Sequence, residues 1–244
     1  MTTSRLRVKI FADGASLDEM TAWARRPDIR GFTTNPTLMR QAGVIDYARF
    51  AHDALRAIPD RPISFEVFSD EFDAMERQAR QMAAWAGNVY VKIPVTNTRG
   101  HSSSALIHRL SHAGLKVNVT AVLSLRQVRE AVDALAGGAP SNISIFAGRI
   151  ADTGRDPVPL IREAVAMASA TPSIELIWAS PREVLNVYQA DDAGCHIVTA
   201  TGGILDKLAL AGKDLEAFSL ETVRMFHNDA ITAGFKLSGG GQPA

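Results

Sequence analysis

Cysteine is nearly absent from this chain, which has one in 244 residues, Cys195. A single thiol excludes an intramolecular disulfide and a metal site built from several cysteines. Long apolar runs are also missing: no stretch reaches the about 18 apolar residues of a membrane-spanning helix, and the N-terminal apolar run is too short for a signal peptide. These absences predict a cytoplasmic protein with no membrane partner.

Net charge is lacking as well. The 26 Lys and Arg residues balance 26 Asp and Glu residues, so the formal net charge is +0. Balanced charge gives no electrostatic reason to expect nucleic acid as a partner. With 46% hydrophobic and 21% charged residues, the composition is that of an ordinary globular protein. The length allows a single α/β barrel of about 250 residues.

Eight short β-branched runs recur along the chain, separated by amphipathic stretches. They span residues 8–14, 31–35, 63–68, 89–95, 115–122, 142–148, 174–180 and 195–201. Near-continuous apolar strands that alternate with helices predict an α/β fold, a single (β/α)8 TIM barrel. An open doubly wound sheet is the alternative. It would be expected to carry a glycine-rich phosphate loop after its first strand, and FADGASLDE is not GxGxxG.

Three segments match the capping-box pattern of a helix start. They are the tetrapeptides that begin at Ser16, Ser124 and Ser180, the last with Pro181 at the first helical position. These starts support the alternation of strands and helices.

An extra C-terminal helix is predicted at residues 219–234. It could pack on the barrel or on a neighbouring subunit, and we expect a homo-oligomer in which subunits could exchange it. We assign residues 1–236 to the barrel domain with this helix and residues 237–244, which are low in complexity, to a disordered tail.

Every predicted strand carries a polar residue at or near its C-terminal end. In a barrel these ends form the mouth, where active sites lie. The set comprises Asp13, Thr33, Asn35, Glu66, Lys92, Asn118, Thr120, Ser144, Ser180 and Thr199. One lysine thus meets two acids and several small hydrogen-bonding groups.

Lys92 lies within the apolar run NVYVKIPVT, where an unpaired ammonium would be costly to bury. One interpretation is an internal ion pair with a carboxylate such as Glu66. The convergence of polar groups favours another: a desolvated amine is neutral often enough to attack a ketone or aldehyde. The protonated imine is an electron sink for carbon–carbon cleavage without a metal, and Asp13 and Glu66 are the candidate proton carriers.

Eight segments resemble, in order and one per strand, the signature segments of the transaldolase family of class I aldolases. They are FADGA, GFTTNPTLM, FEVFSD, YVKIPVT, KVNVTAVLS, SIFAGRIADTG, WASPRE and AGCHIVTA. The resemblance runs from Phe11 to about Thr199. It implies an (α/β)8 barrel with the Schiff-base lysine on the fourth strand, at Lys92, and sugar phosphates as partners. We expect no cofactor, and no metal because the chain offers no complete set of ligands.

By that resemblance, Lys92 forms an imine with a ketose phosphate, such as fructose 6-phosphate, and a dihydroxyacetone unit passes to an aldose phosphate. Asp13 would be the general acid/base, and Glu66 and Thr120 would hold the water that carries protons. The implied substrate-binding residues are Thr33, Asn35, Asn118, Ser144 and Phe146, and, for the phosphate, Arg149, Ser180 and Arg182. The last two are expected at a helix N-terminus, which is a ready anion site.

Two residues favour transfer over free aldol cleavage. The fructose-6-phosphate aldolase branch of the family typically has glutamine and tyrosine where this chain has Glu66 and Phe146. The alternatives are an aldolase that releases free dihydroxyacetone and a catalytically silent ligand-binding barrel.

The chain also departs from the family pattern. Residues 144–146 read Ser-Ile-Phe, where the family usually has Ser-Pro before the aromatic residue. Trp178 stands in place of a small residue, and strand alternation predicts that it faces the same way as Ser180. The polar loop 97–104 is longer than expected and could alter the acceptor side.

Overall fold

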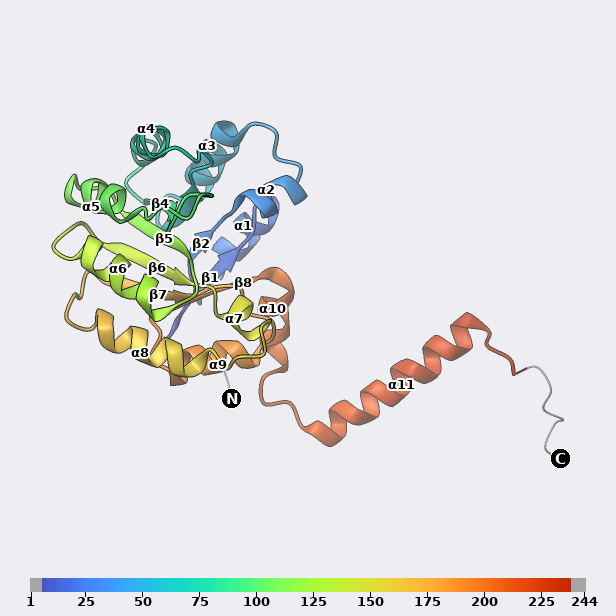
Figure 1. Cartoon of the computed structure of the whole chain (residues 1–244). Coiled ribbons are helices and arrows are strands. Elements are labelled where there is room, and N and C mark those ends of the chain that lie inside the picture. The colour runs from blue at the N-terminus through green and yellow to red at the C-terminus, as the bar shows by residue number, and fades with distance from the viewer. Residues whose placement is uncertain (1–5, 238–244) are drawn as a thin grey trace, which may run out of the picture. The chain divides into compact units, whose positions relative to one another are not determined.

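The computed structural model describes residues 6–237 of the chain. Eight parallel strands form a closed barrel in which each strand pairs with the next and β8 pairs with β1 (Figure 1). The strands are β1 Lys9–Asp13, β2 Ile29–Thr33, β3 Ile63–Glu66, β4 Val89–Pro94, β5 Val117–Val122, β6 Ser141–Ile145, β7 Ile174–Trp178 and β8 Ile197–Thr201. The predicted (β/α)8 barrel is confirmed, and the doubly wound alternative is wrong.

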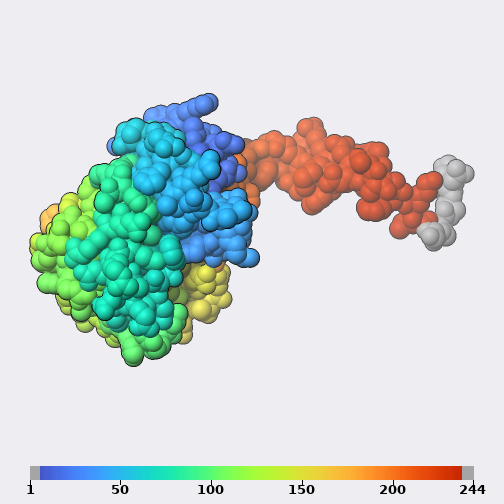
Figure 2. Space-filling view, turned by 90° about the horizontal axis from the view of Figure 1, so that it is seen from above, coloured from blue at the N-terminus to red at the C-terminus, as the bar shows by residue number. Residues whose placement is uncertain are grey.

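Helices connect and cover the strands. They are α1 Leu17–Ala24, α2 Pro36–Gln41, α3 Tyr47–Ala57, α4 Phe72–Ala83, α5 Ser104–His112, α6 Leu125–Leu135, α7 Ala147–Ala151, α8 Val158–Ala168, α9 Leu185–Asp192 and α10 Gly202–Lys207, followed by the 3-10 turn η2 Leu208–Leu210. On the face seen in Figure 2, the first half of the chain, coloured blue to green, forms a continuous outer surface. No helix within residues 6–237 is long and apolar enough to cross a membrane.

The chain divides into two units, one spanning residues 3–209 and the other beginning at Leu210. The second contains the predicted extra helix, α11 Leu215–Ala233. Asp214 caps it by accepting a hydrogen bond from the Ala217 amide at 2.9 Å, and Gly234 ends it in the left-handed conformation, with φ 65°. Apart from its first residue, the predicted tail 237–244 lies outside the described residues.

Two of the predicted helix starts are confirmed. Ser16 accepts a hydrogen bond from the Glu19 amide at 3.4 Å at the start of α1. At α6, Ser124 and Gln127 form a complete capping box, in which each side chain accepts from the other residue's backbone N–H. These caps satisfy amides that the first turn of a helix leaves without partners.

The apolar core has two layers. The larger lies between the strands and the helices, and the smaller fills the inside of the barrel with Phe11, Ile177, Ala179 and Ile197. Gly31 makes room for this filling, since a Cβ there would lie 2.5 Å from the Phe11 ring. Because apolar side chains occupy part of the barrel interior, the polar residues gather at the C-terminal ends of the strands.

Candidate active site

Strand register places Lys92 between an acid and an amide. Glu66 on β3 and Asn118 on β5 are its direct neighbours in the parallel ladder, so the three side chains share one face. The Lys92 side chain is only 6% exposed, and its Nζ lies 3.2 Å from Glu66 Oε2. It also donates a hydrogen bond to the Thr34 carbonyl at 2.9 Å. These two contacts explain how a lysine is accommodated in an apolar strand.

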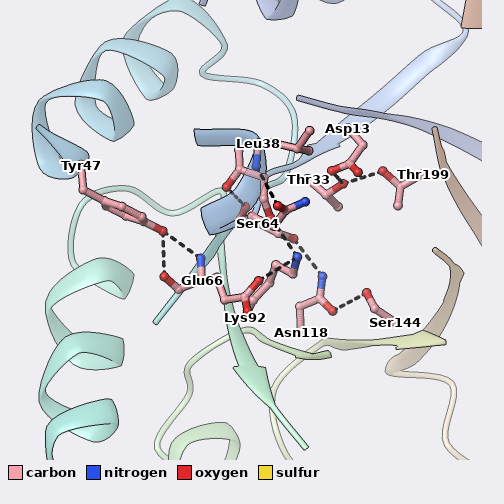
Figure 3. Close-up of polar contacts among 12 residues, drawn as sticks. Asp13, Thr33, Leu38, Tyr47, Ser64, Glu66, Lys92, Asn118, Ser144 and Thr199 are labelled. Atoms are coloured by element: carbon pink, nitrogen blue, oxygen red, sulfur yellow. Dashed lines mark hydrogen bonds and ion pairs between the residues drawn. The ribbon is translucent and has the colours of Figure 1, made fainter. Parts of the chain in front are cut away.

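A second carboxylate, Asp13 at the end of β1, lines the same cavity. Thr33 donates to Asp13 Oδ1 at 2.8 Å, and the Thr33 hydroxyl lies 2.5 Å from that of Thr199 on β8 (Figure 3). Burial raises the pKa of Asp13; the charge of Lys92 and the hydrogen bond from Thr33 oppose this shift, and the charge of Glu66 adds to it. The carboxyl is thus fixed and holds its proton more tightly than a free aspartate.

Asn118 is fixed on both sides by serines. Its Nδ2 donates to Ser64 Oγ at 3.1 Å, and Ser144 Oγ donates to its Oδ1 at 2.8 Å (Figure 3). One Nδ2 hydrogen remains for a ligand, because an amide nitrogen carries two. Asn35 uses only its side-chain oxygen within the fold. Its Oδ1 caps α2 by accepting from the Leu38 amide at 2.9 Å, which leaves its Nδ2 as a donor.

Thr120 contributes a buried hydroxyl to the cavity. Its Oγ1 has no hydrogen-bond partner among the described residues, although the residue is only 1% exposed. The next residue, Ala121, has a φ of 62°, and the pairing of β5 with β6 shifts register here. A strained turn beside an unsatisfied hydroxyl is typical of a site that takes up water or ligand.

The cavity at the strand ends has a volume of about 510 Å³. Eleven of the twelve predicted site residues line it: Asp13, Thr33, Asn35, Glu66, Lys92, Thr120, Ser144, Phe146, Arg149, Ser180 and Arg182. Asn118 contacts the lining residue Ser144 without lining the cavity itself. Gln41 and Thr201 also line it and were not predicted, because no motif distinguishes them from surface residues.

Two arginines lie on one side of the cavity. Arg149, on α7, has its guanidinium carbon 5.8 Å from the centre of the Phe146 ring. Arg182 forms a two-pronged ion pair with Asp152, in which Nε donates to Oδ1 at 3.0 Å and Nη2 to Oδ2. Hydrogen bonds from Arg182 lower the pKa of Asp152. Asp152 was not predicted, and its only sequence signal is its place three residues after Arg149.

The predicted helix start at residues 180–183 is wrong. Helix α9 begins at Leu185, and Ser180 has a left-handed φ of 61°, which is not the extended backbone of most helix caps. Asn186 terminates this loop, because its Oδ1 accepts from the Arg182 amide at 2.7 Å. Arg182 therefore reaches the cavity from the loop before α9 and not from the first turn of that helix.

The predicted orientation of Trp178 is also wrong. It is 1% exposed, packs in the core layer between strands and helices, and does not line the cavity. Ala179 faces the barrel interior, and the left-handed Ser180 breaks the alternation on which the prediction relied.

The loop 97–104 is bound to the connection after β3. The Thr98 amide and hydroxyl donate to the Asp70 carboxylate at 2.7 and 2.8 Å, and Arg99 pairs with Glu71 at 2.8 Å. None of the described loop residues lines the cavity, so this geometry gives no support to an effect on the acceptor side.

Comparisons with known proteins identify the family of this chain. Residues 10–238 match the Transaldolase/Fructose-6-phosphate aldolase family. The chain belongs to that family. It is 33% identical to a "Probable transaldolase" of Dehalococcoides mccartyi, over 81% of this chain and 88% of that protein. It is 34% identical to "Probable transaldolase 2" of Listeria monocytogenes, over 86% of this chain and 94% of the relative.

Solved structures support the fold alone. The chain is similar to KGPDC from Streptococcus mutans, with a TM-score of 0.56 and 12% identity, over 83% of this chain and 91% of that one. The family membership indicates an enzyme of the transaldolase/aldolase type.

Proposed function

We propose that this enzyme transfers a dihydroxyacetone unit from a ketose phosphate, such as fructose 6-phosphate, to an aldose phosphate through an imine on Lys92. The observation that carries the proposal is the position of Lys92 Nζ, 3.2 Å from Glu66 Oε2 in a cavity that Asp13 also lines. A nucleophile and two candidate acid/base groups line one cavity, which is what imine chemistry requires.

The first steps form the imine. The neutral amine of Lys92 attacks the ketone carbon of the donor, and the carbonyl oxygen leaves as water after it has gained two protons. Glu66 and the unpartnered Thr120 hydroxyl hold the water that relays these protons. The protonated imine then draws electrons from the adjacent carbons.

Cleavage follows at the bond beyond the carbon next to the imine. Asp13 takes the proton of the donor hydroxyl, the carbon–carbon bond breaks, and its electron pair moves into the imine to give an enamine. The aldose phosphate leaves with its new aldehyde group. An incoming aldose phosphate reverses these steps, with Asp13 returning the proton, and hydrolysis of the imine restores Lys92.

The substrate is held by neighbouring groups. Asn35 retains an amide donor for a dihydroxyacetone hydroxyl, and Thr33 and Ser144 line the same cavity. Asn118, which is hydrogen-bonded to Ser144, would supply a second amide donor from behind the lining residues. Arg149 and Arg182, with Ser180, would bind the phosphate, since guanidinium groups match phosphate oxygens in geometry and charge.

An assay with fructose 6-phosphate tests this proposal. Transfer requires that the release of glyceraldehyde 3-phosphate depend on added erythrose 4-phosphate, with sedoheptulose 7-phosphate as the second product. The second candidate is a lyase that releases free dihydroxyacetone without an acceptor. Phe146 favours transfer, because its ring carries no hydroxyl that could protonate the enamine and so let dihydroxyacetone leave. Turnover without an acceptor would favour the lyase, and no turnover of any ketose phosphate would favour a silent barrel.

A further inference from the structure

Tyr47, the first residue of α3, contacts the backbone of β3 with its hydroxyl. Its Oη donates to the Glu66 carbonyl at 2.8 Å and accepts from the Glu66 amide at 2.9 Å (Figure 3). The ring packs against Phe65, Phe68 and Trp85, with centroid distances of 6.5, 5.3 and 6.3 Å. The hydroxyl is thus held by a rigid aromatic side chain at the backbone of a proposed catalytic residue.

The hydrogen-bond ladder between β2 and β3 opens at this position. The Thr34 amide donates to the Ser64 carbonyl at 3.1 Å. In a regular parallel pair, the next bond would run from the Glu66 amide to the Thr34 carbonyl. Here the Glu66 amide donates to Tyr47 instead, and the Thr34 carbonyl accepts from Lys92 Nζ at 2.9 Å.

Thr34 is fixed in this arrangement by its own side chain and by the next helix. Its Oγ1 also donates to the Ser64 carbonyl, at 2.9 Å. Asn35 then caps α2, with Pro36 at the start of the helix, so the chain leaves the sheet directly after Thr34. Thr34 is therefore anchored on β3 through its amide and its hydroxyl, and its carbonyl is available to the lysine.

We propose that Tyr47 is a positioning residue for Lys92: its hydroxyl replaces the Thr34 carbonyl in the ladder and so leaves that carbonyl to orient the amine beside Glu66. Without the hydroxyl, the Glu66 amide loses its partner, and a buried unpaired N–H is unfavourable. The Glu66 amide then donates to the Thr34 carbonyl and completes the ladder between β2 and β3. This new bond draws Glu66 toward β2 and occupies the carbonyl oxygen that now accepts from Lys92.

Tyr47→Phe removes only the hydroxyl and keeps the ring packing. The kinetic part of the test rests on the proposed function: fructose 6-phosphate is added in single-turnover experiments, and the imine is trapped with borohydride. We expect the rate constant of trapping at Lys92 to fall about ten- to a hundred-fold, the factor expected for losing one hydrogen bond to a charged group. A merely structural role would lower the amount of trapped protein and leave the rate constant unchanged.

Tyr188→Phe is the matched control. The Tyr188 hydroxyl is buried on α9 and has no partner among the described residues, so its removal tests the loss of a hydroxyl by itself. We expect its trapping rate constant to stay within about two-fold of wild type.

A crystal structure of Tyr47→Phe tests the same inference without substrate. We expect the Glu66 amide to donate to the Thr34 carbonyl and Lys92 Nζ to leave it. A variant that keeps the wild-type rate constant, or whose ladder stays open with Lys92 in place, would overturn the inference. Failure of the wild-type protein to form any adduct would contradict the proposed function instead, and the crystal structure would still decide the role of Tyr47.

Discussion

Lys92 and Glu66 form an ion pair at the centre of the barrel mouth, with Nζ and Oε2 3.2 Å apart and side chains 6% and 17% exposed. Both side chains are largely buried, and each charge is compensated by the other. Ion pairing and imine chemistry are compatible here, since a proton that moves from Lys92 to a neighbouring acid or water leaves a neutral amine in place.

Lys92→Met is predicted to abolish imine formation and to lower the free energy of unfolding by up to about 3 kcal/mol, because it leaves Glu66 without its cation. Adding Glu66→Gln should recover much of that loss, since the amide has the same shape and no charge. Urea unfolding of the wild type, both single variants and the double variant measures the coupling. Additive effects would mean that the pair contributes nothing to stability.

Asp13→Asn is predicted to stabilise the fold at neutral pH. Burial raises the pKa of Asp13, so the folded protein binds this proton more tightly than the unfolded chain. The resulting stabilisation is complete below the unfolded pKa of about 3.9 and is lost as the pH rises through the higher folded value. The variant resembles the protonated acid. Its Tm should exceed that of wild type at pH 7, and the difference should shrink toward pH 3.5.

Glu183→Gln serves as the control for that series, because this exposed carboxylate lies outside the cavity. A Tm difference between Asp13→Asn and wild type that stays constant across the pH range would contradict the raised pKa.

Arg182→Ala is predicted to raise the KM for fructose 6-phosphate about ten- to a hundred-fold, the cost of a lost hydrogen bond to a charged group. Unphosphorylated fructose should be used no worse than by wild type. Arg99→Ala is the matched control, since Arg99 pairs with Glu71 away from the cavity. Equal losses with both sugars would show that Arg182 does not bind phosphate.

Gly148→Ala is predicted to destabilise the protein by about 1–3 kcal/mol and to impair the phosphate side of the cavity. A Cβ at this position would lie 1.5 Å from the Ser180 carbonyl oxygen, and backbone atoms cannot move aside without shifting the loop that carries Arg182. Gly203→Ala on α10 has open space around its Cβ and should be nearly neutral. Thermal unfolding compares the two, and equal stability would show that the close approach is not constraining.

The sequence predicts the barrel and most of its mouth because both follow from periodicity. Consecutive strands pair in order, so a polar residue at the end of each run reaches the same cavity, as Glu66, Lys92 and Thr120 do. Strand ends are less predictable. β2 begins at Ile29, earlier than expected, and α7 begins at Ala147, inside the predicted sixth strand.

The unpredicted features depend on contacts between distant segments or on unusual backbone conformations. Tyr47 reaches Glu66 across 19 residues, and Asp152 reaches Arg182 across 30. Neither pairing leaves a periodic signal. The left-handed conformation of Ser180 is rare for a residue other than glycine, and it breaks both the alternation that misplaced Trp178 and the predicted helix start.

Borohydride trapping shows directly whether Lys92 forms the imine. The wild-type protein is incubated with fructose 6-phosphate, reduced and digested, and the modified peptide is located by mass spectrometry. We expect one adduct, on Lys92, with the mass of dihydroxyacetone less one water plus two hydrogens, and none in Lys92→Met. An unmodified Lys92 in folded protein, or an adduct on another lysine that persists in the variant, would contradict the proposed imine on Lys92.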